Sequence, residues 1–285
     1  MNFLGLPENQ TQYAISPVVI LPCPLEVTTT FMKGTAKGPQ AILEASQQVE
    51  FYDIELKKET WRPGIHTMAP LSLSHGSVEE ALRVIETAVG KVLTDKKFPI
   101  CLGGEHTLSA GAIAAAAKKY PNLSILQIDA HADLRESYEG TPFSHACAMR
   151  LAARYTQKIV GVGIRSVDTE EIAFAKRHPG IQLFFDQERR GDWIQRALKG
   201  LSEDVYLTVD IDGLDPALIP ATGTPEPGGL SWYETLSLIR AVFAEKNVVA
   251  ADLVELLPQP GFHASNFTAA KLVYKMIGYG KGSPS

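Results

Sequence analysis

The hydrophobic positions of the chain fall into short runs that alternate with stretches of helical periodicity over most of its length. Seven of these runs are predicted to be strands, at 17–22, 98–104, 123–129, 158–164, 181–185, 205–212 and 247–256. Several are apolar on both faces, whereas a strand with one face in water would alternate cleanly. This pattern is typical of parallel strands that helices cover on both sides.

Helical periodicity is clearest in three segments between these runs. Residues 38–48 carry Pro39 where a first helical turn tolerates it, and residues 77–93 space their apolar positions three and four apart. Residues 231–246 begin with Ser231 three positions before Glu234, the spacing of a capping box. The alternation of strands and helices predicts the α/β class, with residues 1–285 forming a single three-layer α/β/α domain around a mainly parallel central sheet.

Composition and charge narrow the class of partner. Hydrophobic residues make up 45% of the 285, enough to bury a large core. The 27 basic and 32 acidic residues give a net charge of −5, which argues against nucleic acid or an anionic membrane as the main partner and mildly favours a cationic ligand. No apolar run is long enough to span a membrane and the first residues lack the features of a signal peptide, so we expect a cytoplasmic protein.

Three of the predicted strands end in side chains that commonly bind metals. The run 123–129 leads into Asp129, His131 and Asp133 in strict alternation, and the run 205–212 ends in Asp210 and Asp212. A third strand is followed by a glycine turn and then by Glu105 and His106. Because the carboxyl ends of parallel strands form the ligand crevice of such sheets, we expect these endings to converge.

Four aspartates and two histidines gathered in one crevice would repel one another unless a cation neutralised them. Mixed carboxylate and imidazole donors suit manganese better than magnesium alone. Six ligands are too many for one open catalytic ion, so the sequence favours two ions, about 3.5–4 Å apart, with an activated water between them. The three cysteines include no C-x-x-C pair, which indicates neither a disulfide framework nor a thiolate zinc site.

The order and spacing of six motifs closely resemble the ureohydrolase superfamily of arginases and agmatinases. The motifs span most of the chain and are GGEH (103–106), DAHAD (129–133), SHA (144–146), DIDGLDPA (210–217), GTPEPGGL (223–230) and DLVEL (252–256). DAHAD together with D-x-D-x-x-D-P is the specific part of the pattern. The resemblance implies a three-layer α/β fold, two Mn²⁺ ions per chain and a homo-oligomer, usually a trimer or hexamer.

The resemblance also implies how the ligands divide between the two ions. One ion would be held by His106, Asp129, Asp133 and Asp210. The other would be held by Asp129, His131, Asp210 and Asp212, so that Asp129 and Asp210 bridge the pair.

Family members hydrolyse a guanidinium group to urea and a primary amine. The resemblance implies a role in this reaction for three side chains, one of which is also a predicted metal ligand. Glu255 corresponds to the glutamate that binds the guanidinium, which stays protonated and needs a carboxylate partner. Asp133 would pass a proton to the leaving amine. His145 would shuttle protons between the site and solvent, a role suited to a side chain that titrates near physiological pH.

The segment between DAHAD and SHA bears on the choice of guanidine. Arginases carry Asn two residues after the last Asp of DAHAD and Ser-Gly-Asn just before the His, whereas this chain has Arg135 and TPFS (141–144) there. The segment therefore resembles the agmatinase branch, whose substrate is cleaved to urea and putrescine. We expect Arg135 at the substrate site, with Glu139 or Glu136 pairing with the far ammonium of the substrate. N1-aminopropylagmatine, guanidinobutyrate and arginine remain alternative substrates.

Rival functions from other classes also remain open. Cys147 and His145 could form a cysteine hydrolase acting through a covalent amidino intermediate, although side chains two apart at a helix start would diverge. A non-catalytic regulatory relative and a one-zinc deacetylase are further alternatives. The remaining histidines lack ligand partners and are expected to be loop or surface residues, at positions 66, 75, 178 and 263.

Overall fold

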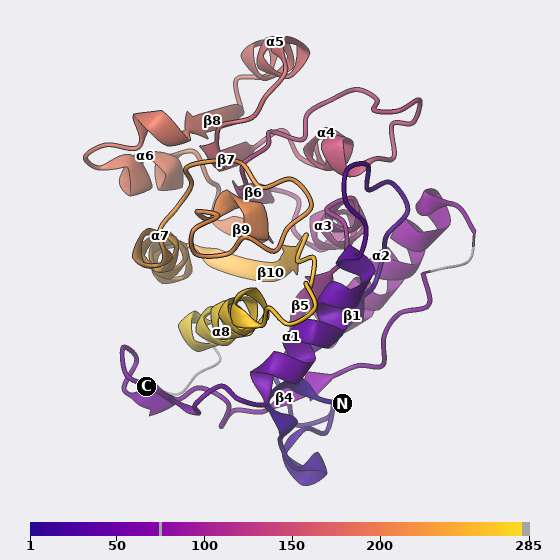
Figure 1. The fold of residues 1–285 in the computed structure, drawn as a ribbon, viewed down its shortest axis with the longest axis vertical. Helices are drawn as coiled ribbons and strands as arrows, with labels where there is room; N and C mark the ends of the chain where they lie inside the picture. The colour runs from indigo at the N-terminus through magenta and orange to yellow at the C-terminus, as the bar shows by residue number, and fades with distance from the viewer. Residues whose placement is uncertain (74–75, 281–285) are drawn as a thin grey trace.

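The computed structural model describes residues 1–73 and 76–280, and its centre is an eight-stranded sheet in which every paired strand is parallel (Figure 1). The strand order is β4-β1-β5-β10-β9-β6-β7-β8. The bounds are β1 Val18–Cys23, β4 Ile65–Thr67, β5 Phe98–Gly103, β6 Ser124–Ile128, β7 Ile159–Ile164, β8 Ile181–Phe185, β9 Asp204–Asp210 and β10 Asn247–Val254. All seven predicted strands are present, and the predicted α/β class with its parallel sheet is confirmed.

Helices pack on both faces of this sheet and make it the middle of three layers (Figure 1). One apolar core joins the sheet to α1 (Gly38–Ser46), α6 (Trp193–Lys199), α7 (Trp232–Glu245) and α8 (Ala264–Tyr279). A second core joins its other face to α2 (Val78–Thr94), α3 (Leu108–Lys119), α4 (Ala148–Ala152) and α5 (Thr169–Arg177). The central strands are therefore covered on both faces, which explains why their sequences do not alternate.

Shorter elements complete the fold. Strands β2 (Tyr52–Asp53) and β3 (Lys58–Glu59) form a small antiparallel pair outside the main sheet. Single 3₁₀ turns lie at η1 Phe3–Gly5, η2 Glu8–Gln10, η3 Thr35–Lys37, η4 His145–Cys147, η5 Asp186–Glu188 and η6 Ile211–Gly213. Strands β2, β3 and β4 were not predicted, because two- and three-residue strands carry too few positions for a periodic pattern.

The three helices predicted from periodicity are all present, and their ends follow the expected capping chemistry. Ser231 accepts a hydrogen bond from the backbone N–H of Glu234, and the Glu234 carboxylate accepts from the backbone N–H of Ser231 in return. Ser77 and Glu80 form the same reciprocal pair at the start of α2. Each cap satisfies backbone N–H groups that a first helical turn leaves without partners.

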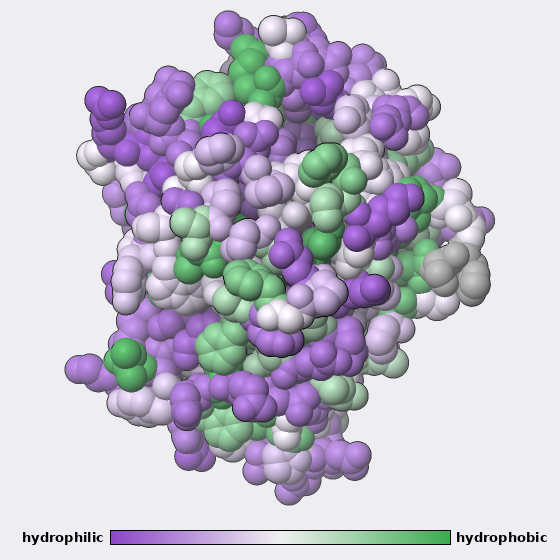
Figure 2. Space-filling view, in the orientation of Figure 1, coloured by the Kyte–Doolittle hydropathy of each residue, from purple (hydrophilic) through white to green (hydrophobic). Residues whose placement is uncertain are grey.

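The face shown in Figure 2 carries apolar side chains in small groups scattered among hydrophilic ones. None of the helices in the described part of the chain is both long enough and apolar enough to cross a membrane.

Candidate metal centre and active site

The candidate site lies where four neighbouring strands end. Strands β5, β10, β9 and β6 are adjacent in the sheet and run in the same direction. Asp129 follows β6 directly, Asp210 is the last residue of β9, and Glu255 follows β10. His106 lies three residues beyond β5, after the turn at Gly103 and Gly104. The parallel register therefore gathers residues that are up to about half the chain apart in sequence, as expected from the strand endings.

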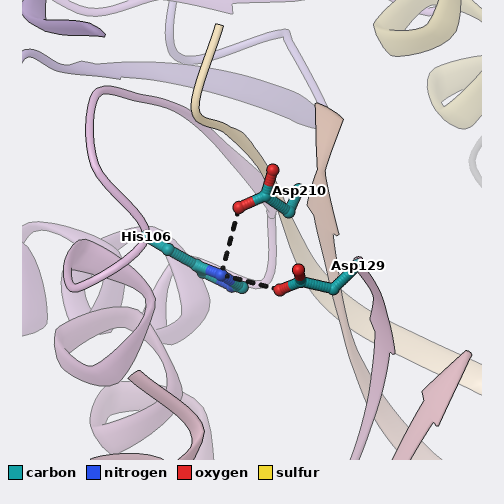
Figure 3. Close-up of side chains that lie close together, drawn as sticks. All are labelled: His106, Asp129 and Asp210. Carbon is teal, nitrogen blue, oxygen red and sulfur yellow. Dashed lines mark ion pairs between the residues drawn. The ribbon is translucent and has the colours of Figure 1, made fainter. Parts of the chain in front are cut away.

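The imidazole of His106 faces three carboxylates at once. Its Nδ1 lies 3.1 Å from Oδ2 of Asp129, 3.0 Å from Oδ2 of Asp133 and 3.4 Å from Oδ2 of Asp210. Figure 3 shows the ring pointing between the carboxylates of Asp129 and Asp210. All four side chains are buried. The four residues predicted to hold the first ion are thus together in space.

A second group adjoins the first through Asp129. Nδ1 of His131 lies 3.0 Å from Oδ2 of Asp212 and 3.6 Å from Oδ1 of Asp129. Three of the four residues predicted for the second ion, namely Asp129, His131 and Asp212, therefore form one cluster. Asp210 groups with the first set in the structure, so its role as a second bridge stays a prediction.

Backbone N–H groups and one amide hold these carboxylates in place. Asp129 accepts from the backbone N–H of His131 at 2.6 Å and from the side-chain amide of Gln127 at 2.8 Å. Asp212 accepts from the backbone N–H of Ala130 at 3.0 Å, and its own N–H donates to Asp210 at 2.9 Å. Such hydrogen bonds orient the remaining carboxylate oxygens before any ligand arrives.

A hydroxyl that the sequence pattern did not single out orients His106. Thr208 donates its proton to Oδ1 of Asp252 at 2.6 Å, and its oxygen lies 2.9 Å from Nε2 of His106. Since the hydroxyl proton is already used, Nε2 must be the donor and Nδ1 is the nitrogen left toward the carboxylates. Thr208 lies inside a predicted strand, and only the two-residue spacing to Asp210 hints that it faces the same side.

The donor set fits a divalent cation better than it fits protons. Even with both imidazoles protonated, the four aspartates would leave two negative charges in a buried site, which is costly without a counter-ion. Burial lowers the pKa of His106, but the surrounding carboxylates outweigh burial and raise that pKa well above its usual value. A cation placed among the same oxygens relieves the same repulsion. Nδ1 of His106 is moreover a buried polar atom without a hydrogen-bond partner of acceptable geometry.

Asp133 and Glu255 both sit on strained backbone. Their φ angles are 53° and 62°, in the left-handed region that costs a non-glycine residue about 1–2 kcal/mol. Oε1 of Glu255 accepts from the backbone N–H of His106 at 2.7 Å, which ties the carboxylate to the loop that carries His106. Burial raises the pKa of Glu255 to about 8, and burial together with the Asp129 charge raises the pKa of Asp133 to about 7. A positively charged partner would therefore stabilise the ionised form of both carboxyls.

These residues open onto a cavity of about 220 Å³. We call its acidic end the floor, formed by His106, His131, Asp133, Asp210, Asp212 and Glu255. We call its outer part the rim, formed by Thr30, Phe31, Met32, Arg135, Tyr138 and Thr224. His145 lies on the cavity wall, with its ring edge-on to Tyr138 at 5.8 Å between centroids, and burial lowers its pKa.

The residues predicted for the far end of the substrate lie in different places. Arg135 lines the cavity, with its guanidinium 3.3 Å from Oδ2 of Asp168 and over the ring of Tyr138. Glu139 and Glu136 are exposed, and neither lines this cavity in the described structure. A contact of either acid with the substrate therefore stays a prediction.

Cys147 lies outside the cavity lining and is fully buried. Burial raises the pKa of its thiol to about 11, so little thiolate is present near neutral pH. Of the histidines expected to be loop or surface residues, His66 instead lies half-buried in strand β4, so the prediction is wrong for it, and its ring bonds to a backbone carbonyl. His178 is half-buried at the end of α5 and also bonds to a backbone carbonyl, and His263 is exposed at the start of α8. His75 lies outside the described residues.

Comparison with known proteins decides the family. The family model described as Arginase family matches residues 16–278, which is most of the chain. The protein belongs to the arginase family. An arginase-family chain with this cluster is a ureohydrolase, a hydrolase of guanidino compounds.

Other arginase-family proteins resemble the chain over nearly its full length. An N(1)-aminopropylagmatine ureohydrolase of Synechocystis sp. is 40% identical over 281 residues, covering 95% of this chain and 92% of that protein. An agmatinase of Halalkalibacterium halodurans is 38% identical, covering 94% of each chain. The crystal structure of the agmatine ureohydrolase of Thermoplasma volcanium superposes with a TM-score of 0.87 at 29% identity, covering 95% of this chain and 92% of that one.

Proposed function

We propose that the protein is a manganese-dependent ureohydrolase that cleaves agmatine, or a guanidine with a longer amine tail, into urea and a primary amine. The observation that carries the proposal is the charge of the cavity. Four carboxylates line it, and Arg135 is the sole lysine or arginine among its described lining residues. Asp168 balances that single cation at 3.3 Å. Two divalent cations would offset the ligand aspartates, which leaves Glu255 for the guanidinium. Because Asp168 pairs with Arg135, the described lining offers no unpaired lysine or arginine to a substrate carboxylate, which favours a substrate that ends in an amine.

We propose that two divalent cations bind among the ligands predicted from the sequence. His106 and Asp133 would serve one ion, His131 and Asp212 the other, and Asp129 and Asp210 would serve both. The clusters around His106 and His131 support this division, and mixed imidazole and carboxylate donors support manganese. When bound, the pair would supply an activated water at neutral pH and balance the charge of the carboxylates.

The chain's own residues would then carry out binding and proton transfer. Glu255 receives the guanidinium through charge-assisted hydrogen bonds, and its bond from the His106 N–H keeps the carboxylate in position. Water adds its oxygen to the guanidinium carbon while the bond from that carbon to the substituted nitrogen breaks. The substituted nitrogen gains both protons of the water. Asp133 delivers one, and His145 relays the other, in exchange with solvent, so urea forms and the positive charge leaves with the ammonium product.

A urea-release assay on four guanidines tests the substrate. With added Mn²⁺, we expect agmatine or N1-aminopropylagmatine to exceed arginine and guanidinobutyrate by about a hundredfold in kcat/KM, because a misplaced carboxylate costs several kcal/mol. A preference for arginine would refute the substrate proposal and leave the ureohydrolase chemistry standing.

Metal analysis separates the proposed function from the rival functions. About two ions per chain support the proposal. A single zinc supports the deacetylase, and no ion after manganese incubation supports the non-catalytic relative.

Three broader predictions accompany this function. We propose that residues 1–285 form one ureohydrolase domain, which the family match over 16–278 supports. We further propose a homo-oligomer, a trimer or hexamer, and a cytoplasmic location. Light scattering on the purified protein measures the oligomeric state directly.

A further inference from the structure

A buried carboxylate and a threonine lie behind His145, on the side of its ring that carries Nδ1. Glu105 is fully buried, and its Oε2 accepts from the backbone N–H groups of Val27 and Thr28, both at 2.6 Å. Its Oε1 lies 2.9 Å from the hydroxyl of Thr28. That hydroxyl in turn lies 3.0 Å from the backbone nitrogen of His145 and 3.3 Å from its Nδ1. These contacts connect a strand-end motif to a loop more than 70 residues away.

The Thr28 hydroxyl has one proton to give and two lone pairs that can accept. Oε2 of Glu105 already accepts two short backbone hydrogen bonds, and a carboxylate can only accept. The hydroxyl proton must therefore point at Oε1 of Glu105, because a hydroxyl lone pair facing a carboxylate oxygen at 2.9 Å would be repelled. One lone pair accepts the backbone N–H of His145, and the other is left for Nδ1.

We propose that Glu105 and Thr28 are positioning residues that hold His145 as the Nδ1–H tautomer. Nε2 is then the basic nitrogen, and it is the ring nitrogen without a hydrogen-bond partner among residues 1–73 and 76–280. His145 lines the cavity, so protons enter and leave the site through Nε2 while Nδ1–H keeps the ring in place. The kinetic consequences of this inference rest on the proposed function, whereas the tautomer itself does not.

The tautomer can be measured directly by long-range ¹H–¹⁵N correlation spectra of histidine side chains. The probe is the full-length chain labelled at its seven histidines and loaded with a diamagnetic divalent cation, because Mn²⁺ broadens nearby signals. The spectrum of His145→Asn assigns the His145 signals by their loss. We expect a pyrrole-type shift at Nδ1 and a pyridine-type shift at Nε2. A pyrrole-type Nε2 in the wild-type protein would overturn the inference.

Three substitutions test what sets the tautomer. Thr28→Val removes the hydroxyl at nearly constant volume and should leave a mixture of tautomers, whereas Thr28→Ser keeps the hydroxyl and should keep the wild-type spectrum. Glu105→Gln should invert the tautomer. The two backbone N–H groups hold the amide oxygen, so the amide N–H₂ faces Thr28 and turns the hydroxyl proton toward Nδ1. An unchanged tautomer in Glu105→Gln would contradict the assignment.

The same variants separate positioning from simple structural support. We expect Thr28→Val and Glu105→Gln each to lower kcat about 10- to 100-fold, with KM changed less than about threefold. Thr28→Ser, which keeps the hydroxyl, should keep a kcat near that of the wild type. Bound metal should be unchanged in all three. Wild-type kcat in Thr28→Val would overturn the inference without touching the proposed function. A wild-type enzyme that releases no urea from any guanidine would refute the proposed function and leave the spectra as an independent test.

Discussion

The floor and the rim of the cavity are built in opposite ways. Floor residues sit at or just beyond the ends of buried strands, where His106 is 1% and Asp210 is 3% exposed, and backbone or hydroxyl hydrogen bonds fix their orientation. Rim residues lie on loops, and Phe31 is 76% and Met32 is 44% exposed. The sheet thus determines the geometry of the floor, whereas the rim consists of loops that can change without disturbing the core.

This contrast predicts two classes of mutant. A change in the floor should lower turnover of every guanidine by a similar factor, because it acts on the common reacting group. A change in the rim should alter the ratio between guanidines and leave the rate on the best one nearly intact. The size of the expected effect decreases from the floor outward.

The largest effect is expected from Asp210→Asn. The amide removes one negative charge that faces His106 at 3.4 Å and weakens the hold on the first ion. We expect kcat to fall about a thousandfold or more, equivalent to about 4 kcal/mol, together with a loss of bound metal. Urea release and metal analysis on the same preparation measure both. Asp215→Asn is the matched control, because that carboxylate caps a turn by accepting from the N–H of Ala217 and should leave activity unchanged.

A smaller effect is expected from Thr208→Val, which removes the hydroxyl between His106 and Asp252. We expect divalent metal affinity to fall about 10- to 100-fold, because Nε2–H loses its acceptor and the ring loses its orientation. Titration of the metal-free protein with Mn²⁺, followed by recovery of activity, measures the affinity. Thr208→Ser should retain most of it. If the valine variant bound metal as tightly as the wild type, orientation of His106 by Thr208 would be ruled out.

The floor was predictable from the sequence for a physical reason. Ligand-type side chains at the ends of apolar strands have few structural uses, and parallel topology forces neighbouring strand ends together. The proximity of Asp129 and Asp210 therefore follows from their positions at two such strand ends. Even so, the sheet order was not predictable, since β10 lies between β5 and β9 although it is the last strand in the chain order.

Other parts of the molecule carry too little local signal. Helix α3 is buried at every position from Leu108 to Ala116 and has no side-chain cap, so it lacks the one-sided apolar face that marked α2. Thr28 and Glu105 meet across 77 positions through the hydroxyl and the backbone N–H of Thr28, and nothing in the residues around either one indicates that contact. The rim was equally hard to predict from the sequence, because Phe31 and Met32 are loop residues whose pattern matches neither a strand nor a helix.

The rim itself is probed by Arg135→Ala. Removing this cation leaves the carboxylate of Asp168 without its ion-pair partner and makes the outer cavity more negative. We expect kcat/KM to shift toward agmatine and away from guanidinobutyrate by about two- to fivefold, and the shift should shrink at high salt. Arg154→Ala provides a control at an exposed arginine outside this cavity. An equal drop on both substrates would instead assign Arg135 to the common chemistry of the floor.

The smallest effect on activity is expected at Cys147, which separates hydrolysis in this cavity from a thiol mechanism. Its side chain is fully buried and does not line the cavity, so Cys147→Ser should leave kcat within about twofold of the wild type. The new hydroxyl has to find a partner at a fully buried position, so thermal unfolding should show a loss of about 1–2 kcal/mol. Cys147→Ala adds no polar group and separates the two effects. If both variants lost several orders of magnitude in kcat while keeping their metal and fold, nucleophilic attack by the thiol would replace water activation as the mechanism.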